Sequence, residues 1–393
     1  MDEVMNGVTS DTTHHTPSPQ RINRRRLLLS AAAGLGALAV PAGARWWAVR
    51  ENARGPRLWD AAAGGGRVVP SADPRGHLYV AGYDGSVRAL DPGTGTVRWA
   101  AEVSTADDAG NRGGWPLAEG GGVVCVNSAT KVQVFDAASG ERRWEIAVPD
   151  WRDLSTPQGV AVVGDSVITV EGASLRAFDA ATGQARWIGP PVVSGAPLVA
   201  GDTVYLPGRS AGLLAFDVRS GEQRWAQDGV GFVLDPPVVH GGIVCLADTD
   251  LAAGGSTVFA LDAATGRVLW KRAQRSGVTG PVAAGGAVCL LKGDRLLALD
   301  AATGDERWTA TVPPGMGRGM SSLTAADGAV YVGTNDDRLF AYDLTTGRLR
   351  WQDEPEHLTA DTAFTWVSLA AAGSAVYRGS RTGLRAFAAL PRA

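Results

Sequence analysis

The sequence predicts an all-β fold: an eight-bladed β-propeller of four-stranded antiparallel blades, closed by an N-terminal strand that joins the C-terminal blade. The first observation is a recurring phrase of Asp, a Gly four residues later and a Trp four residues after that, as in Leu299–Trp308. The second is its period, because successive Trp residues of the phrase are 38 to 45 positions apart, a spacing typical of propellers and other repeat arrays. The third is composition: 52 Gly and 21 Pro, with 45% apolar residues, suit many short strands and turns around a large core.

Each copy of the phrase is expected to form a β-hairpin whose Trp is buried against a neighbouring sheet. The Asp carboxylate accepts backbone N–H groups two residues on, and the Gly adopts the left-handed conformation that closes the turn. The complete copies are Asp91/Gly95/Trp99, Asp136/Gly140/Trp144, Asp179/Gly183/Trp187, Asp217/Gly221/Trp225, Asp262/Gly266/Trp270, Asp300/Gly304/Trp308 and Asp343/Gly347/Trp351. A weaker eighth copy is Glu51/Gly55/Trp59.

The arithmetic of the repeats predicts eight blades and their closure. Residues 60–393 make eight units of about 42 residues, and a propeller blade of four strands has this length. The last unit contains the strand Leu384–Phe387 but lacks the phrase that should follow it. Glu51–Trp59 supplies the missing piece, so both ends of the chain are expected to share one blade and leave no free sheet edge.

The N-terminal region, residues 1–44, is predicted to be a separate segment preceding a propeller domain of residues 45–393. It contains a polar stretch, the basic cluster Arg24–Arg26, an apolar run to Val40 and the small residues Pro41–Ala44. This order resembles a twin-arginine export signal. We therefore expect an exported protein, secreted after cleavage behind Ala44 or anchored to the outer face of the cytoplasmic membrane by an uncleaved signal. No Cys follows the apolar run, which argues against a lipoprotein.

The net charge and the positions of the cysteines limit the kinds of partner and site that are expected. The net charge is -3 with basic residues scattered through the repeats, so no nucleic-acid partner is expected. Cys125, Cys245 and Cys289 occupy the same slot in three repeats and are interpreted as buried strand residues in separate blades. Membrane contact is expected only through the N-terminal segment, and the protein is expected to be a monomer.

The phrase Ala-Leu-Asp-Ala-Ala-Thr-Gly-x-x-x-Trp resembles the tryptophan docking repeat of the pyrroloquinoline-quinone (PQQ)-like propellers, over residues 51–388. The resemblance implies eight blades, with each Trp packed between its own blade and the next. This family includes quinoprotein dehydrogenases, with PQQ and calcium in the central channel. It also includes non-catalytic propellers, such as the scaffold of the bacterial outer-membrane assembly machine and the sensor domains of some receptor kinases.

The chain departs from the dehydrogenase branch. Those enzymes are longer and place a vicinal Cys pair against the cofactor, whereas Cys245 and Cys289, the nearest pair here, are 44 positions apart. No equivalent set of channel carboxylates is assignable. We therefore predict no enzyme activity, no cofactor and no metal, and a scaffold that binds a protein or peptide in the cell envelope. The alternatives are a quinone-dependent or other small-molecule enzyme using the channel, and a sensor of envelope ligands.

Other motifs are interpreted as structural. Gly208–Gly212 matches the Gly-x-Ser-x-Gly of hydrolases but falls between two predicted strands, without the helix which that motif requires. Asp248–Asp250 and Asn335–Asp337 are expected to be solvated inter-strand turns, since they lack the Gly and distal Glu of a calcium loop. His240, beside a turn, is expected to be exposed.

The candidate binding residues are the Trp residues outside the repeat, Trp115, Trp151 and Trp366, together with Arg318. Each follows a repeat Trp and precedes the first strand of the next blade, so all are expected on one face around the channel mouth. Long loops on a rigid frame are common binding sites, and exposed aromatic and Arg side chains often dominate binding energy.

Overall fold

The chain divides into two units, residues 1–50 and residues 51–393. The fold is that of the second unit. The computed structural model describes residues 55–61, 66–70, 76–82, 84–103, 116–128, 131–147, 159–171, 174–191, 196–208, 212–233, 235–249, 254–313, 322–326, 328–354, 367–380 and 383–389. The export-signal and domain-boundary predictions at residue 44 lie outside these residues. Within them the regular structure is entirely β-strand, and no helix has the length and apolar character needed to cross a bilayer.

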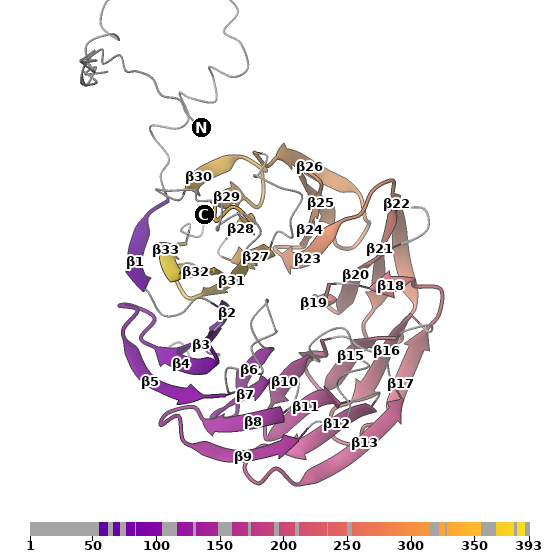
Figure 1. The fold of residues 1–393 in the computed structure, drawn as a ribbon. Helices are drawn as coiled ribbons and strands as arrows, with labels where there is room; N and C mark the ends of the chain where they lie inside the picture. The colour runs from indigo at the N-terminus through magenta and orange to yellow at the C-terminus, as the bar shows by residue number, and fades with distance from the viewer. Residues whose placement is uncertain are drawn as a thin grey trace, which may run out of the picture. The chain divides into compact units, whose positions relative to one another are not determined.

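The strands form eight antiparallel sheets that follow one another around a central axis (Figure 1), which confirms the predicted propeller. Blade one is β2 (Gly66–Pro70), β3 (Leu78–Gly82), β4 (Ser86–Leu90) and β5 (Val97–Glu102). Blade two is β6 (Leu117–Gly120), β7 (Val123–Asn127), β8 (Lys131–Asp136) and β9 (Arg142–Ala147). Blade three is β10 (Val160–Val163), β11 (Ser166–Glu171), β12 (Ser174–Asp179) and β13 (Ala185–Pro191). Blade four is β14 (Leu198–Ala200), β15 (Thr203–Pro207), β16 (Leu213–Asp217) and β17 (Gln223–Gln227).

The remaining blades follow the same order, with one additional strand in blade five. Blade five is β18 (Phe232–Val233), β19 (Val238–His240), β20 (Ile243–Thr249), β21 (Ser256–Asp262) and β22 (Val268–Gln274). Blade six is β23 (Thr279–Ala284), β24 (Ala287–Lys292), β25 (Arg295–Asp300) and β26 (Glu306–Thr311). Blade seven is β27 (Ser322–Ala326), β28 (Ala329–Gly333), β29 (Leu339–Asp343) and β30 (Leu349–Asp353). Blade eight is β31 (Ser368–Ala372), β32 (Ala375–Ser380), β33 (Gly383–Ala388) and, at its outer edge, β1 (Arg57–Ala61).

The ring closes as predicted, through a strand from each end of the chain. β1 pairs antiparallel with β33, with Trp59 opposite Ala386 and Ala61 opposite Leu384. β1 is therefore the outermost strand of blade eight, although it precedes β2 of blade one in sequence. Without β1, blade eight would have three strands with β33 at its edge; with β1 it has four, and every blade, contrary to the prediction, keeps an outer edge strand.

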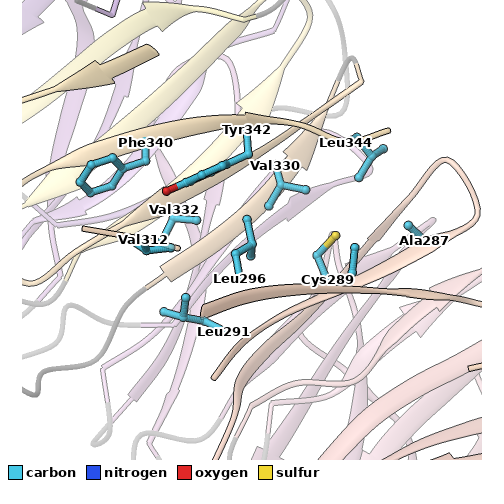
Figure 2. Close-up of a cluster of buried hydrophobic side chains, with 11 residues drawn as sticks. Ala287, Cys289, Leu291, Leu296, Val312, Val330, Val332, Phe340, Tyr342 and Leu344 are labelled. Carbon is cyan, nitrogen blue, oxygen red and sulfur yellow. The ribbon is translucent and has the colours of Figure 1, made fainter. Parts of the chain in front are cut away.

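The core of this all-β fold is divided among the seams between neighbouring blades. The described residues form eight buried apolar clusters, one for each pair of adjacent blades around the ring. Figure 2 shows the seam between blades six and seven, where Leu296 and Cys289 lie opposite Val330 and Tyr342. Cys125 and Cys245 are likewise buried, in the seams of other blades, as predicted.

The hairpin turn is built as the phrase predicts. In the sixth blade the Asp300 carboxylate accepts the N–H groups of Ala302 and Thr303, at 2.9 and 3.0 Å. Gly304 has φ +77°, a conformation that residues with a Cβ atom rarely adopt. The chain then turns into β26, which carries Trp308.

Every repeat Trp lies against the turn glycine of the next blade. A Cβ atom added to any of the eight turn glycines would lie 2.5–2.8 Å from the indole of the preceding blade. In seven of the eight seams the indole Nε1 also donates a hydrogen bond of 2.8–3.1 Å to a backbone carbonyl of that turn. Trp351 is the exception, since its Nε1 has no partner among the described residues. The indoles therefore link neighbouring blades by contact in all eight seams and by hydrogen bond in seven of them.

Arginine side chains add a second polar layer to most of these turns. The Arg143 guanidinium lies 2.6 Å from the Asp136 carboxylate and lowers the pKa of Asp136 to about 2. Arg224 does the same for Asp217, also to about 2. Leu269 occupies the position of this Arg in blade five, and Leu58 does so in blade eight. Both leucines are exposed.

The antiparallel order gives the propeller two different faces. The Asp-Gly turns, which join the third and fourth strands of a blade, lie on one face. The connections from the fourth strand to the next blade, and the turns between second and third strands, lie on the opposite face because strand direction alternates. We call this opposite face the loop face.

Candidate functional site: the loop face

The four predicted binding residues, Trp115, Trp151, Arg318 and Trp366, lie outside the described residues. Their positions in the chain still assign them to one kind of connection, because each stands between the fourth strand of one blade and the first strand of the next. The strands that flank these segments, such as β5 and β6 around Trp115, have their adjoining ends on the loop face. Whether the four side chains gather there stays a prediction.

The described part of the loop face contains an aromatic residue that sequence reasoning missed. Phe232 lies on the short strand β18, in the connection from blade four to blade five, and 41% of its surface is exposed. β18 pairs with the end of β20, placing Phe232 opposite Thr249, while β19 pairs with the start of β20. The first strand of blade five is thus split into β18 and β19. β18 is the part nearer the loop face, and it carries the exposed ring of Phe232.

Two aspartates hold this element in place. Asp248 accepts hydrogen bonds from Gly231 N at 2.8 Å and from Thr257 N at 2.7 Å, which connects β18 to the rest of its blade. Asp235, between β18 and β19, accepts a bond of 3.0 Å from Gly280 N in blade six. Burial raises the pKa of the Asp235 carboxyl. The expectation that Asp248 belongs to a solvated turn is therefore wrong: it lies in β20 and its carboxylate organises the backbone.

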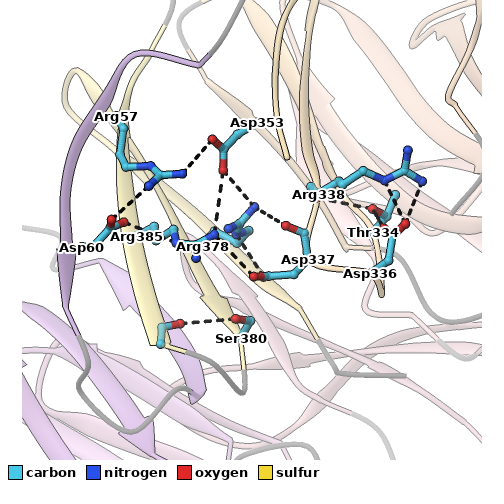
Figure 3. A network of polar contacts seen from close by, with 11 residues as sticks. Arg57, Asp60, Thr334, Asp336, Asp337, Arg338, Asp353, Arg378, Ser380 and Arg385 are labelled. Carbon is cyan, nitrogen blue, oxygen red and sulfur yellow. Dashed lines mark hydrogen bonds and ion pairs between the residues drawn. The ribbon is translucent and has the colours of Figure 1, made fainter. Parts of the chain in front are cut away.

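A second polar feature of this face is a buried network at the seam of blades seven and eight (Figure 3). Asn335, Asp336 and Asp337, in the turn between β28 and β29, are only 4%, 2% and 1% exposed. Predicting these residues as a solvated turn was wrong, because side chains of blade eight cover them. Arg378 of β32 donates to the Asp337 carbonyl at 2.6 Å and lies 3.3 Å from its carboxylate. Asp337 also has a φ of +62°, the only positive value at a non-glycine residue described.

The network continues across the ring closure as alternating charges. Arg378 is 1% exposed, and burial lowers its pKa while Asp337 opposes the shift. Its Nη1 lies 3.5 Å from Asp353 at the end of β30. Asp353 in turn pairs with Arg57 of β1 at 3.1 Å, and Arg385 of β33 lies 3.4 Å from Asp337. These contacts connect blade seven, blade eight and the N-terminal strand.

A separate pair closes the other side of the same turn. Arg338 lies 2.8 Å from Asp336, and Thr334 donates to the Asp336 carboxylate at 2.5 Å. The Arg338 guanidinium also lies over the ring of Phe340, 5.4 Å from its centroid. The whole network is balanced, because its members Arg57, Arg338, Arg378 and Arg385 match Asp60, Asp336, Asp337 and Asp353 in number.

The innermost strands offer little chemistry. The first strands of most neighbouring blades contact one another around the axis, as β2 does with β6 and with β31. Their described side chains are mainly Val, Ala, Leu, Ser and Thr, and Glu119 of β6 is the one carboxylate in these strands. His240 of β19 was expected to be exposed, but it is half-buried and accepts a 3.2 Å hydrogen bond from Gly286 N. In the described ranges no group of three or more His, Cys, Asp or Glu side chains is arranged to hold a metal ion.

Comparison with known proteins adds a family to this geometry. A family model described as outer membrane protein assembly factor BamB matches residues 32–272 and 254–390. The BamB of Nitrosomonas eutropha is 36% identical over 118 residues, which is 29% of this chain and 26% of that protein. The BamB of Moranella endobia is 26% identical over 319 residues, covering 73% of this chain and 78% of that protein. The chain thus spans about a quarter of the first relative and most of the second.

Solved structures share the fold at low sequence identity. The crystal structure of BamB from Moraxella catarrhalis matches with a TM-score of 0.63 and 18% identity, covering 85% of this chain and 98% of that one. The quinohemoprotein alcohol dehydrogenase of Comamonas testosteroni matches with a TM-score of 0.57 and 16% identity, covering 86% of this chain and 76% of that one. At such identities the likeness shows the propeller architecture alone.

Proposed function

This chain belongs to the family of the outer membrane protein assembly factor BamB, and on that premise we propose that it is an exported, non-catalytic scaffold that binds a protein or peptide in the cell envelope. The family match over the blades is the observation that carries this proposal. Relatives that share most of the propeller are named as assembly factors for membrane proteins. Assembly of other proteins calls for a binding surface rather than for a reactive site.

The geometry supports a binding role in two ways. Eight apolar seams and the indole contacts between blades make a rigid frame, on which loops are presented for recognition. The described innermost strands, with Glu119 as their one carboxylate, provide few groups for acid–base or metal chemistry. A scaffold function therefore fits this chain, which combines an ordered frame of eight blades with the connections of the loop face.

We assign the binding surface to the loop face. Its proposed contact residues are Trp115, Trp151, Arg318 and Trp366, joined now by Phe232. Aromatic and Arg side chains carry a disproportionate share of interface energy, and truncating one such residue at the centre of an interface costs about 2 kcal/mol or more. Phe232 is the member whose anchoring is visible, because Asp248 and Asp235 fix the backbone on both sides of it.

The test compares variants of the two surfaces in the same full-length chain. The partner is first captured from an envelope extract and identified by mass spectrometry, and its affinity is then measured with purified proteins. Phe232→Ala and Trp115→Ala are each expected to weaken binding by about tenfold or more. Ile188→Ala is the matched control, since Ile188 is 63% exposed but lies on the outer strand β13. Unchanged affinity in both loop-face variants would remove this surface from the proposal.

The alternative function, a quinone-dependent enzyme, has a direct test. PQQ and calcium are titrated into the purified protein, and dye reduction is followed across alcohols and sugars. The proposal predicts neither saturable quinone binding nor turnover. Saturable binding accompanied by substrate-dependent dye reduction would replace the scaffold function by an oxidoreductase.

Export is proposed from the N-terminal sequence. Lys substitution of Arg24 and Arg25 is expected to leave the full-length chain in the cytoplasm if the twin-arginine route carries it. Fractionation of cells expressing the wild-type and substituted chains measures this, and size on a gel separates cleavage behind Ala44 from retention as an anchor. Equal export of both chains would exclude the twin-arginine route.

A further inference from the structure

The strand that closes the ring differs from the other outer strands in what holds it. Among the described strands, β1 pairs only with β33, over four pairs of residues with an irregularity between Arg57 and Trp59. The fourth strands of blades one to seven follow their third strands through the short Asp-Gly turn, so the local chain fixes their register. β1 lies more than three hundred residues from β33 in sequence, and local connectivity provides no such guidance.

Its charged side chains contact two different elements of the ring. Arg57 lies 3.1 Å from Asp353, which ends β30 in blade seven, and 3.1 Å from Asp60 of its own strand. Asp60 lies 3.3 Å from Arg385 of β33. β1 therefore contributes one positive and one negative side chain, and each meets an opposite charge already present in the seam (Figure 3).

Asp353 and Arg385 each form a shorter ion pair with β1 than with any of their other partners. Without Arg57, Asp353 keeps ion pairs of 3.5 Å to Arg378 and 3.9 Å to Arg385. Without Asp60, Arg385 keeps its 3.4 Å contact with Asp337 and the 3.9 Å contact with Asp353. Losing Arg57 would leave the buried Asp353 carboxylate with only these longer ion pairs, which is destabilising because the charge itself stays desolvated. The buried side chain of Asp353, 8% exposed, thus makes the seam sensitive to which strand is seated beside it.

Most other outer strands lack this charge order. β1 has Arg two positions before its Trp and Asp one position after it. The corresponding pairs in blades one to seven are Val97/Ala100, Arg142/Glu145, Ala185/Ile188, Gln223/Ala226, Val268/Lys271, Glu306/Thr309 and Leu349/Gln352. Only β9, with Arg142 and Glu145, has the same order of charges. A strand shifted by one residue would also fail, because such a slip turns every side chain to the other face of the sheet.

We propose that Asp353 and Arg385 form a charge-coded seat that selects β1 and fixes its register on β33 when the ring closes. The seat selects by opposite charge. Asp353 forms an ion pair with Arg57 at the start of the strand, and Arg385 forms one with Asp60 near its end. Arg378 lies 3.5 Å from Asp353 and Asp337 lies 3.4 Å from Arg385, so both residues of the seat have an ion pair that does not involve β1. This device concerns closure of the propeller and is independent of the partner proposed for the loop face.

The test reverses the two charges without changing composition. A protease recognition sequence is placed within residues 62–65 of the full-length chain, which is folded and then cleaved so that residues 1–61 remain bound through noncovalent contacts alone. Release of this fragment is followed by gel filtration and mass spectrometry. In the Arg57→Asp/Asp60→Arg double variant, release is expected to be at least tenfold faster, equivalent to 1.4 kcal/mol. The same reversal in β9, Arg142→Glu/Glu145→Arg, is the matched control and is expected to leave release unchanged.

Two outcomes decide against the proposal: release of the reversed fragment at the wild-type rate, or equal acceleration by the β9 reversal. If the reversed chain is not recovered folded, the Arg57→Gln/Asp60→Asn variant is cleaved instead and compared in about 0.05 and 0.5 M NaCl. Salt is expected to accelerate release of the wild-type fragment severalfold and to have much less effect on the neutral one, because half-exposed ion pairs are screened. The same salt dependence in both would show that these charges do not hold the strand.

Discussion

Adding one methyl group beside an interblade indole should be markedly more costly than adding it to an otherwise similar glycine. Gly304 and Gly293 both lie in turns of blade six, with φ of +77° and +61°. A Cβ atom at Gly304 would lie 2.7 Å from the Trp270 ring, whereas one at Gly293 would meet nothing within 4 Å. Gly293→Ala therefore carries the left-handed backbone penalty alone, and Gly304→Ala carries that penalty plus a steric overlap.

The two contributions give an expected difference. A non-glycine residue in the left-handed region costs about 1–2 kcal/mol. Forcing extra volume into a packed contact costs about 1–3 kcal/mol more. We thus expect Gly293→Ala to lower the free energy of unfolding by about 1–2 kcal/mol and Gly304→Ala by about 2–5 kcal/mol.

Urea denaturation followed by circular dichroism measures both variants. Combining Gly304→Ala with Trp270→Ala provides the decisive comparison, because removing the ring leaves room for the new methyl group. In that background the added cost of Gly304→Ala should fall to that of Gly293→Ala. Equal costs for the two alanine variants in the wild-type background would refute the argument that the indole packs on this glycine.

Three further predictions concern other parts of the frame. Tyr205→Phe should lower stability by only about 0.5–1 kcal/mol in thermal unfolding, because the Ala263 carbonyl loses one donor at 3.1 Å but keeps the Trp225 indole. Acid should destabilise the turns: the pKa values of Asp136 and Asp217 are about 2 in the folded protein, below their unfolded values, so their contribution is present above about pH 4 and is lost towards pH 2. Melting temperatures of wild type and an Asp136→Asn/Asp217→Asn variant should therefore converge as the pH falls through this range. Burial raises the pKa of Asp235, so Asp235→Asn should be at least as stable as wild type at pH 7, by calorimetry, and should lose any advantage in acid.

The fold was predictable because one short phrase encodes both a turn and a contact. The Asp and Gly of each copy specify the hairpin locally, and the Trp four residues later is placed where it meets the next blade. Repetition then fixes the number of blades, and the incomplete last copy identifies β1 as the closing strand. None of these inferences needed contacts between distant residues.

The buried ion-pair network between blades seven and eight was not predictable, because its partners lie far apart in the sequence. Asn335–Asp337 is a polar turn between two strands, and such turns are usually solvated. Here Arg378, about forty residues later, and Arg385 cover it from the next blade, and nothing near the turn in sequence announces them. His240 was misjudged similarly, because its hydrogen-bond partner belongs to the neighbouring blade.

Phe232 shows a milder failure of the same kind. Its connection between blades four and five is shorter than the loops that drew attention to Trp115 and Trp366, so length as a criterion passed over it. The usable signal was position, since any aromatic residue between a repeat Trp and the next first strand maps to the loop face. The strand β18 could not be foreseen, because it depends on Asp248 accepting the Gly231 N–H across the sheet.

The claim that the loop face is the binding surface is tested most directly by site-specific photo-crosslinking in cells. A photoreactive phenylalanine analogue is placed at Phe232 of the full-length chain and, separately, at Ile188 on the outer rim. We expect one dominant crosslinked protein at position 232 that is absent at position 188. A partner captured only from the rim, or equally from both positions, would contradict it.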